Sequence, residues 1–175
     1  MHTQGYAGLD PGHRVYQFST SLPYLLARLG VRMGELFGRE LALEGLTLSM
    51  YRVLAALTEA GETLRLNELS ARTTVEMSTM SRLLTQMQRI GLVTRERPEN
   101  NQRSLSVGLT AMGVAAAQRL IPRAAHYERV VMGELTPDRA GQLKADLIQF
   151  YDRLNFLEDQ VKKAEENKLI APKYL

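Results

Sequence analysis

The sequence predicts a mainly α-helical fold that carries one small β-hairpin. Apolar residues recur at helical spacing over most of the 175 residues, and they change to alternate spacing only between residues 92 and 109. Hydrophobic residues make up 45% of the chain and charged residues 23%, which is the composition of a folded domain. A chain of this length forms a core without disulfides or a bound metal, and it accommodates one domain with helical arms.

Four helices are expected before the hairpin. Residues 1–21 contain scattered glycine and proline and predict an N-terminal arm. The first helix, over 22–43, follows from its apolar spacing, and the second, over 48–59, is capped by Thr47 and ended by Gly61. A short helix over 66–72 and a longer one over 77–90 follow.

The hairpin is predicted where the spacing of apolar residues changes to every second position. Residues 92–96 form its first strand, and residues 104–109, where Leu105, Val107 and Leu109 alternate with small residues, form the second with one face buried. Residues 97–103 between them contain Pro98, two asparagines and two arginines, which predicts a charged turn.

Two long helices follow the hairpin. Thr110 caps the first, which runs to about Gly133 with a kink expected at Pro122. Thr136 and Pro137 open the second, which is expected to end near residue 167 and to leave a C-terminal tail at 168–175. Its apolar residues are spaced four and three apart, which indicates packing against another helix: Leu143, Leu147, Phe150, Leu154 and Leu157.

Three short helices followed by a hairpin with a basic tip form the order of a winged helix-turn-helix. A helix fits the major groove of DNA, where base edges differ, and an arginine-bearing hairpin reaches the neighbouring minor groove. At about 100° per residue, Ser78, Arg82, Thr85 and Arg89 share one face of the helix over 77–90, opposite its apolar residues. Thr79, Ser81 and Gln86 flank that face, which contains no carboxylate. Such a face suits contact with phosphates.

The distribution of charge supports this interpretation. The formal net charge is +3, and residues 65–103 carry seven arginines against four acidic residues. Every basic residue before position 144 is arginine, whose planar guanidinium suits phosphates and base edges.

Several short segments resemble the MarR family of transcriptional regulators, over roughly residues 22–165. Residues 78–84 resemble the core of the recognition helix in that family, and residues 90–93 resemble the junction between helix and wing. Asn101-Gln102-Arg103 and the segment 109–113, Leu-Thr-Ala-Met-Gly, resemble the wing motif Asp-x-Arg and the Leu-Thr-x-x-Gly that follows it. Two positions depart from the pattern: Asn101 replaces the usual aspartate, and Glu76 replaces a good N-cap such as serine.

The resemblance implies a homodimer that binds a palindromic DNA operator. It implies a winged helix-turn-helix at 46–110 and a helical dimerisation region at 22–45 and 111–167. We expect Ser78, Thr79 and Arg82 to contact bases. Thr85, Arg95 and Arg97 are expected to contact phosphates, and Arg103 to enter the minor groove. Arg89 is either part of this surface or a structural ion-pair partner.

The family resemblance also implies a small aromatic or phenolic effector that releases a repressor from DNA. The candidate lining residues of its site combine aromatic and basic side chains: His13, Arg14, Tyr16, Tyr24, Arg28, Met33 and Met50. Core and dimer packing is the alternative explanation for the tyrosines and methionines.

Other classes of protein are less compatible with the sequence. There is no cysteine, no metal-ligand spacing of histidines, no glycine-rich phosphate loop and no nucleophile motif, so we expect neither an enzyme nor a cofactor or metal. No apolar run suits a membrane span or a signal peptide, and a cytoplasmic location is expected. A winged-helix protein-interaction module and an architectural DNA-binding protein without sequence preference or ligand remain as alternatives.

Overall fold

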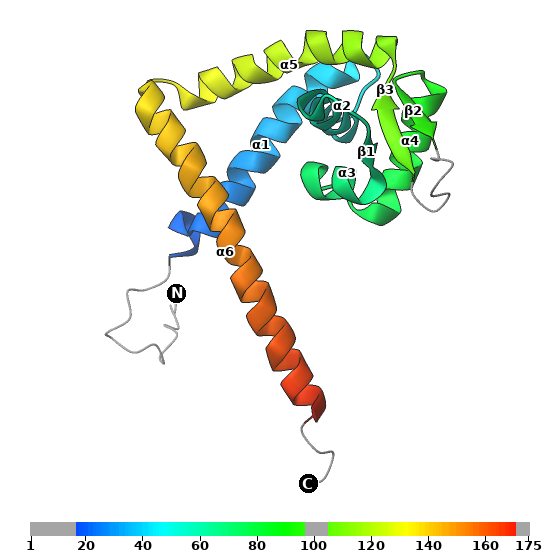
Figure 1. Ribbon diagram of the computed structural model, residues 1–175. Helices are drawn as coiled ribbons and strands as arrows, with labels where there is room; N and C mark the ends of the chain where they lie inside the picture. Colours follow the sequence, from blue (N-terminus) through cyan, green and yellow to red (C-terminus); the bar gives the residue numbers. More distant parts are fainter. Residues whose placement is uncertain (1–16, 97–104, 171–175) are drawn as a thin grey trace, which may run out of the picture. The chain divides into compact units, whose positions relative to one another are not determined.

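The computed structural model describes residues 17–96 and 105–170, and it confirms a mainly helical fold with a small antiparallel sheet. The elements, labelled in Figure 1, are a 3-10 turn η1 (Phe18–Thr20), α1 (Leu22–Ala42), α2 (Leu48–Ala60), β1 (Leu64–Arg65), α3 (Leu66–Thr73), α4 (Met77–Arg89), β2 (Val93–Glu96), β3 (Ser106–Leu109), α5 (Ala111–Met132) and α6 (Pro137–Ile170).

The chain divides into two compact units, residues 1–127 and 128–175. The first unit holds the sheet and the helices α1 to α4 together with most of α5, and the second holds the end of α5 and all of α6. The boundary lies inside the helical region predicted at 111–167. That this region mediates dimerisation remains a prediction.

Helices α2 and α5 begin where the sequence predicts because threonine caps satisfy their free backbone groups. The Thr47 hydroxyl accepts a hydrogen bond from the Met50 N–H at 3.2 Å, and Gly61 ends α2 in a left-handed conformation with φ +67°. At the start of α5 the Thr110 hydroxyl accepts from the Gly113 N–H at 3.0 Å and donates to the Gly91 carbonyl at 2.5 Å. This second cap ties α5 to the turn after α4.

The sheet contains one more strand than the sequence predicted. Its order is β1-β3-β2, with Leu64 paired to Val107 and Val93 paired to Leu109, all antiparallel. Strand β1 has two residues, too few to produce an alternating pattern that sequence analysis recognises. The prediction of one buried face on β3 was also incomplete, because Gly108 is buried beside Val107 while Leu109 is half-buried.

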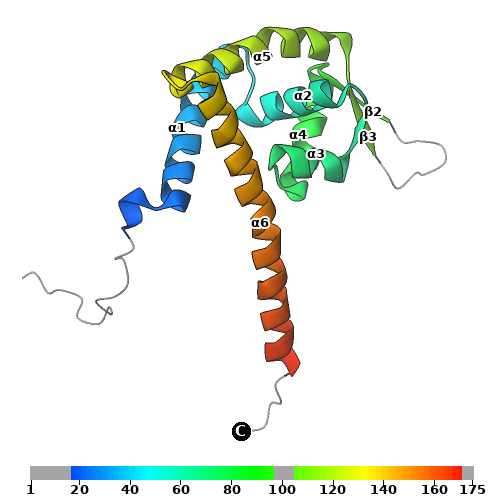
Figure 2. The same cartoon turned by 60° about the vertical axis from the view of Figure 1, so that its left-hand side comes forward.

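The core of the first unit lies among α2, α3, α4, the sheet and the first turns of α5, and the C-terminal half of α1 joins it. Figure 2 shows α2, α3 and α4 side by side next to the strands, and these helices contact one another. The largest fully buried side chains come from all of these elements: Leu41, Met50, Val53, Leu54, Leu69, Met80, Leu84, Met87, Val93, Val107 and Leu120. This shared core holds α4 with a fixed face toward solvent.

Ion pairs join α1 and the turn that follows it to α5 within the first unit. The Glu44 carboxylate accepts hydrogen bonds from Arg119 at 3.2 Å and Arg123 at 2.5 Å, and Glu40 lies 3.6 Å from the Arg123 guanidinium. The hydrogen bond from Arg119 is the largest cause that holds the pKa of Glu44 below its ordinary value of 4.5. Burial opposes it, and the hydrogen bond from Arg123 and the charges of both arginines lower the pKa further.

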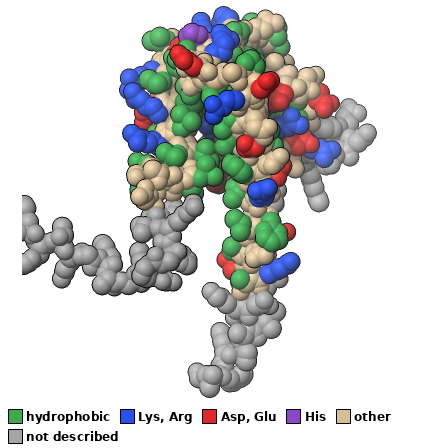
Figure 3. Space-filling view, turned by 90° about the vertical axis from the view of Figure 1, so that its left-hand side faces the viewer, with side chains coloured by type: hydrophobic (Ala, Val, Ile, Leu, Met, Phe, Trp, Pro, Cys, Tyr) green, Lys and Arg blue, Asp and Glu red, His purple; other side chains and the backbone are tan. Residues whose placement is uncertain are grey.

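In the second unit, α6 exposes much of its apolar surface. Figure 3 shows apolar side chains between charged ones along this helix. Phe150, Leu154 and Leu157 of the predicted packing stripe are 39%, 54% and 56% exposed. A single chain therefore leaves this stripe uncovered among the residues that the structure describes. No described helix combines the length and apolarity needed to cross a membrane.

Candidate nucleic-acid interface and aromatic hollow

Helix α4 separates its side chains as the sequence predicts. Met80, Leu83, Leu84 and Met87 are buried in the core. The opposite side is exposed and polar, and we call it the α4 ridge: Ser78, Thr79, Ser81, Arg82, Thr85, Gln86 and Arg89. The ridge is shallowly hollowed between Ser81, Arg82, Thr85, Gln86 and Arg89, with a volume of about 400 Å³. These short donors and guanidinium groups suit contact with nucleic acid.

The charge of the ridge is wholly positive. Arg82 and Arg89 carry it, and no ion pair of Arg89 occurs among the described residues. The carboxylate next to the ridge belongs to Glu76, which precedes α4, is exposed, and makes no capping hydrogen bond with its side chain. The prediction that Glu76 is a poor cap is confirmed.

Two residues predicted to contact phosphates contact each other. Arg95 of β2 donates to the Thr85 hydroxyl at 2.8 Å, and that hydroxyl donates to the Ser81 carbonyl at 2.9 Å. The one hydroxyl proton of Thr85 is therefore engaged within α4, so Thr85 has no proton to offer a phosphate. The Thr85 hydroxyl therefore holds the half-buried Arg95 guanidinium at the ridge.

Part of the predicted site lies outside the described residues. Arg97, Asn101 and Arg103 of the predicted wing tip, and His13, Arg14 and Tyr16 of the predicted effector site, belong to this group. The roles assigned to them remain predictions.

A hollow lined by aromatic side chains lies between α1, α2 and α5, and we call it the aromatic hollow. Its volume is about 200 Å³, and its lining is Gly30, Met33, Gly34, Phe37, Leu48, Tyr51, Arg52, Ala124 and Tyr127. The Phe37 ring lies 4.8 Å from that of Tyr51, nearly perpendicular, and 5.4 Å from that of Tyr127. Among these described lining residues, Arg52 alone carries a charge.

Hydrogen bonds at the edge of the aromatic hollow fix two of its side chains. The Tyr127 hydroxyl is hydrogen bonded to Glu40, and this bond, with burial and the glutamate charge, raises the pKa of Tyr127 above its usual value of 10.0. The Arg52 guanidinium donates to the Thr74 hydroxyl at 3.1 Å. Thr74 lies between α3 and α4, so one residue of the hollow reaches the turn before the ridge.

The structure separates the predicted effector residues that it describes. Met33 lines the aromatic hollow. Tyr24 and Arg28 line a shallow groove formed by α1 alone. Met50 is fully buried in the core and does not line the aromatic hollow, so the structure does not support its assignment to a ligand site. Met50 belongs to the buried face of α2, whereas its neighbours Tyr51 and Arg52 lie about 100° and 200° further round the helix.

The sequence did not indicate the aromatic and charged side chains of the aromatic hollow. Phe37, Tyr51, Arg52 and Tyr127 were not among the predicted effector residues. The available signal was Tyr51-Arg52 on the edge of an otherwise apolar helix. Only the packing of α1 and α5 on α2 brings these residues together.

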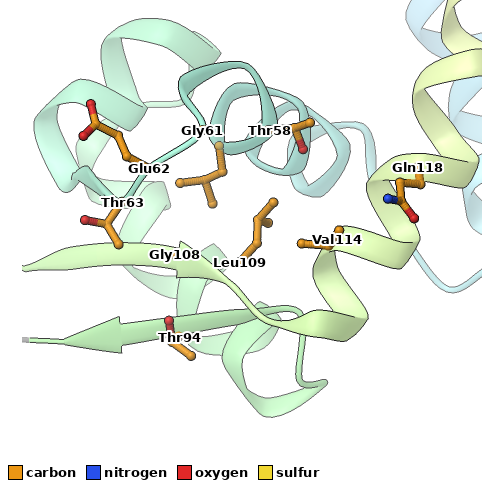
Figure 4. Close-up of a pocket in the computed structure, with 10 residues that line it drawn as sticks. Thr58, Gly61, Glu62, Thr63, Thr94, Gly108, Leu109, Val114 and Gln118 are labelled. Carbon is orange, nitrogen blue, oxygen red and sulfur yellow. The ribbon is translucent and has the colours of Figure 1, made fainter.

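A larger hollow of about 450 Å³ lies where the end of α2 meets β3 and α5. In Figure 4, Leu109 and Val114 point toward its middle and Glu62 lies at its edge. Its described lining includes this carboxylate and no cation, and so it is less suited to an acid than the aromatic hollow. No described group of acidic or histidine side chains is arranged to hold a metal ion.

A winged helix-turn-helix in which α4 exposes a basic ridge defines a DNA-binding protein. Comparison with known proteins agrees: residues 46–105 match the family model described as "MarR family". A transcriptional regulator of the MarR family from Silicibacter pomeroyi has a similar structure, with a TM-score of 0.69 and 32% identity over 77% of this chain and 90% of that one. The chain belongs to the MarR family, and it is a DNA-binding transcriptional regulator rather than an enzyme.

Two repressors are also similar in sequence. The HTH-type transcriptional repressor YetL of Bacillus subtilis is 26% identical over 161 residues, which cover 90% of this chain and 92% of that protein. The homoprotocatechuate degradative operon repressor of Escherichia coli is 30% identical over 105 residues, which cover 60% of this chain and 70% of that protein.

Proposed function

We propose that the protein is a repressor that binds a palindromic operator as a homodimer and is released by a small aromatic acid. The observation that carries the DNA-binding part is the α4 ridge, which is exposed, rich in hydroxyls and free of carboxylates. Arg82 near its middle is the candidate for bidentate contact with a guanine, and Arg95, held by Thr85, is the candidate for phosphate contact.

The apolar surface of α1 and α6 supports a homodimer. Leu22, Leu25 and Leu29 of α1 are 48%, 45% and 48% exposed, and the stripe on α6 is similarly uncovered. A second copy of the chain covers such surfaces, and a two-fold dimer places two recognition helices on successive turns of a palindrome.

The aromatic hollow supports an effector of one ring. A cavity of about 150 Å³ is known to hold benzene, so about 200 Å³ suits a benzene ring with one or two small substituents. The single guanidinium at the hollow favours a carboxylate on that ring. The E. coli relative represses a homoprotocatechuate degradative operon, and homoprotocatechuate is itself an aromatic acid.

The test begins with selection of duplexes from a random pool, followed by binding at several salt concentrations. Arg82→Ala should weaken binding to the selected duplex by about 1–3 kcal/mol and relax the preference at one base pair. Arg95→Ala should weaken all duplexes alike and reduce the slope of log K against log salt by about one. Arg139→Ala, an exposed arginine of α6, is the control and should change neither.

Three results contradict the proposal. Unchanged binding of Arg82→Ala would remove the ridge from the interface. Equal affinity for random and selected duplexes would indicate an architectural DNA-binding protein. No affinity for duplex at low salt would favour a protein-interaction module.

A further inference from the structure

Arg52 occupies two environments at once. Its side chain lines the aromatic hollow, and its guanidinium donates to the Thr74 hydroxyl at 3.1 Å in the turn between α3 and α4. We infer that Arg52 is the switch between ligand and DNA: an aromatic carboxylate in the hollow withdraws the guanidinium from Thr74 and thereby loosens the turn that positions α4. This inference rests on the effector role proposed above.

Thr74 is held in an unfavourable backbone conformation. Its φ is +55° and its ψ is +25°, and it is the non-glycine residue with positive φ among those that the structure describes. A β-branched side chain costs free energy there, so surrounding contacts must maintain the conformation. Thr74 is the C-cap residue of α3, where helices commonly end in this conformation, and it sets the direction in which the chain enters α4.

Hydroxyl groups supply much of the support for this turn. The Thr74 hydroxyl donates to the Thr73 carbonyl at 2.7 Å, the Ser70 hydroxyl donates to the Val75 carbonyl at 2.7 Å, and the Thr73 hydroxyl donates to the Leu69 carbonyl at 2.6 Å. Arg52 is the described partner that reaches Thr74 from another helix. Its withdrawal removes the side-chain hydrogen bond between α2 and Thr74, while the flanking Thr73 and Val75 stay buried in the core, so the change is confined to Thr74 and the start of α4.

The competition for Arg52 favours a carboxylate. A guanidinium bound to a carboxylate makes two charge-assisted hydrogen bonds, whereas the threonine hydroxyl accepts one bond and carries no charge. Arg52 is exposed at its α2 position, so movement of its side chain disturbs no core packing. Ligand binding and the bond to Thr74 are then mutually weakening, and the coupling between them must be reciprocal.

Reciprocity gives a test that needs no DNA. Benzoate is titrated calorimetrically into the full-length protein, with benzamide as the neutral probe. Arg52→Met should weaken benzoate binding at least tenfold, while Arg39→Met, at an exposed arginine of α1 that does not line the aromatic hollow, should stay within twofold of the wild type. Thr74→Val should bind benzoate about two- to tenfold more tightly, because no hydroxyl competes for Arg52. Thr74→Ser keeps the hydroxyl and should match the wild type.

The double variant completes the cycle. In the Arg52→Met background, Thr74→Val should leave the affinity for benzoate unchanged, because the competing pair no longer exists. Thr74→Gly, which lacks the hydroxyl and tolerates positive φ, replaces Thr74→Val if circular dichroism shows that the valine variant does not fold.

The selected duplex then separates the two proposals. Benzoate should weaken DNA binding by the wild type and by Thr74→Ser, and should change the affinity of Thr74→Val less than twofold. If Thr74→Val binds benzoate as the wild type does and releases DNA equally, the switch is overturned while the regulator and its hollow stand. If the wild type binds DNA but not benzoate, both the effector site and the switch are overturned.

Discussion

Replacing Gly113 with alanine tests how α5 is joined to the turn after α4. A Cβ atom at Gly113 would lie 2.0 Å from the Leu92 carbonyl oxygen and 3.1 Å from its carbonyl carbon. Real Cβ contacts do not fall below 3.0 Å, so the two backbone segments must separate by about 1 Å. Both of these Leu92 atoms belong to the backbone, so the contact cannot be relieved by rotation of a side chain.

The cost follows from what the separation disturbs. Overpacking of a well-packed site costs about 1–3 kcal/mol. The same junction contains the Thr110 N–H bonded to the Leu92 carbonyl at 3.1 Å and the Thr110 hydroxyl bonded to the Gly91 carbonyl, each worth about 1 kcal/mol. Alanine returns at most about 0.5–1 kcal/mol through its helix preference. We therefore expect Gly113→Ala to lower the free energy of unfolding by about 2–4 kcal/mol.

Chemical denaturation at one fixed protein concentration measures this change. The matched control is Gly30→Ala in α1, where the added Cβ meets nothing within 4 Å. That variant should be more stable than the wild type by about 0.5–1 kcal/mol. Opposite signs for the same substitution in two helices would support the described packing. A Gly113→Ala variant as stable as the wild type would refute it.

Three further substitutions probe the DNA face, the α1–α5 ion pairs and the surface of α6. Glu76→Gln removes the carboxylate next to the α4 ridge and should strengthen binding to any duplex several-fold in a low-salt titration; weaker binding would instead show that Glu76 contacts a base. Glu44→Gln should destabilise the protein by about 1 kcal/mol near neutral pH. The pKa of Glu44 is lower in the folded chain than in the unfolded chain, so its contribution to stability is present above pH 4.5 and is lost as the pH falls through the folded pKa. Denaturation curves of the wild type and Glu44→Gln should therefore converge in acid. A difference in stability that stays constant with pH would count against the ion pairs. Leu154→Glu on the α6 stripe should shift sedimentation toward monomer, whereas Ala145→Glu on the opposite side of α6 should not; identical behaviour would argue against a dimer through this helix.

The two faces of α4 were predictable because the burial of its residues follows from its own sequence. The apolar residues Met80, Leu84 and Met87 repeat at helical spacing, so the core side and the exposed side of α4 are both determined locally. The caps Thr47 and Thr110 were predictable for a related reason, since a cap acts on backbone groups two or three residues away.

The relation between Thr85 and Arg95 was not predictable in this way. The sequence indicated that Thr85 and Arg95 make two separate phosphate contacts. In the structure the Arg95 guanidinium donates a hydrogen bond to the Thr85 hydroxyl, because β2 lies against α4. Strand β1 was not predicted for a similar reason, since its two residues form a strand only because β3 lies beside them.

The predicted effector site shows most clearly which features follow from the sequence and which follow from tertiary packing. The family resemblance led to Met50 as a candidate, yet its side chain faces the core, and the neighbouring Tyr51 and Arg52 line the hollow instead. Helical periodicity is a local pattern, and it is sufficient to predict which residues share a face of a helix. Which face meets α1 and α5, and therefore that Arg52 lies between the hollow and Thr74, depends on contacts between residues far apart in the chain, and those are decided only when the whole core packs.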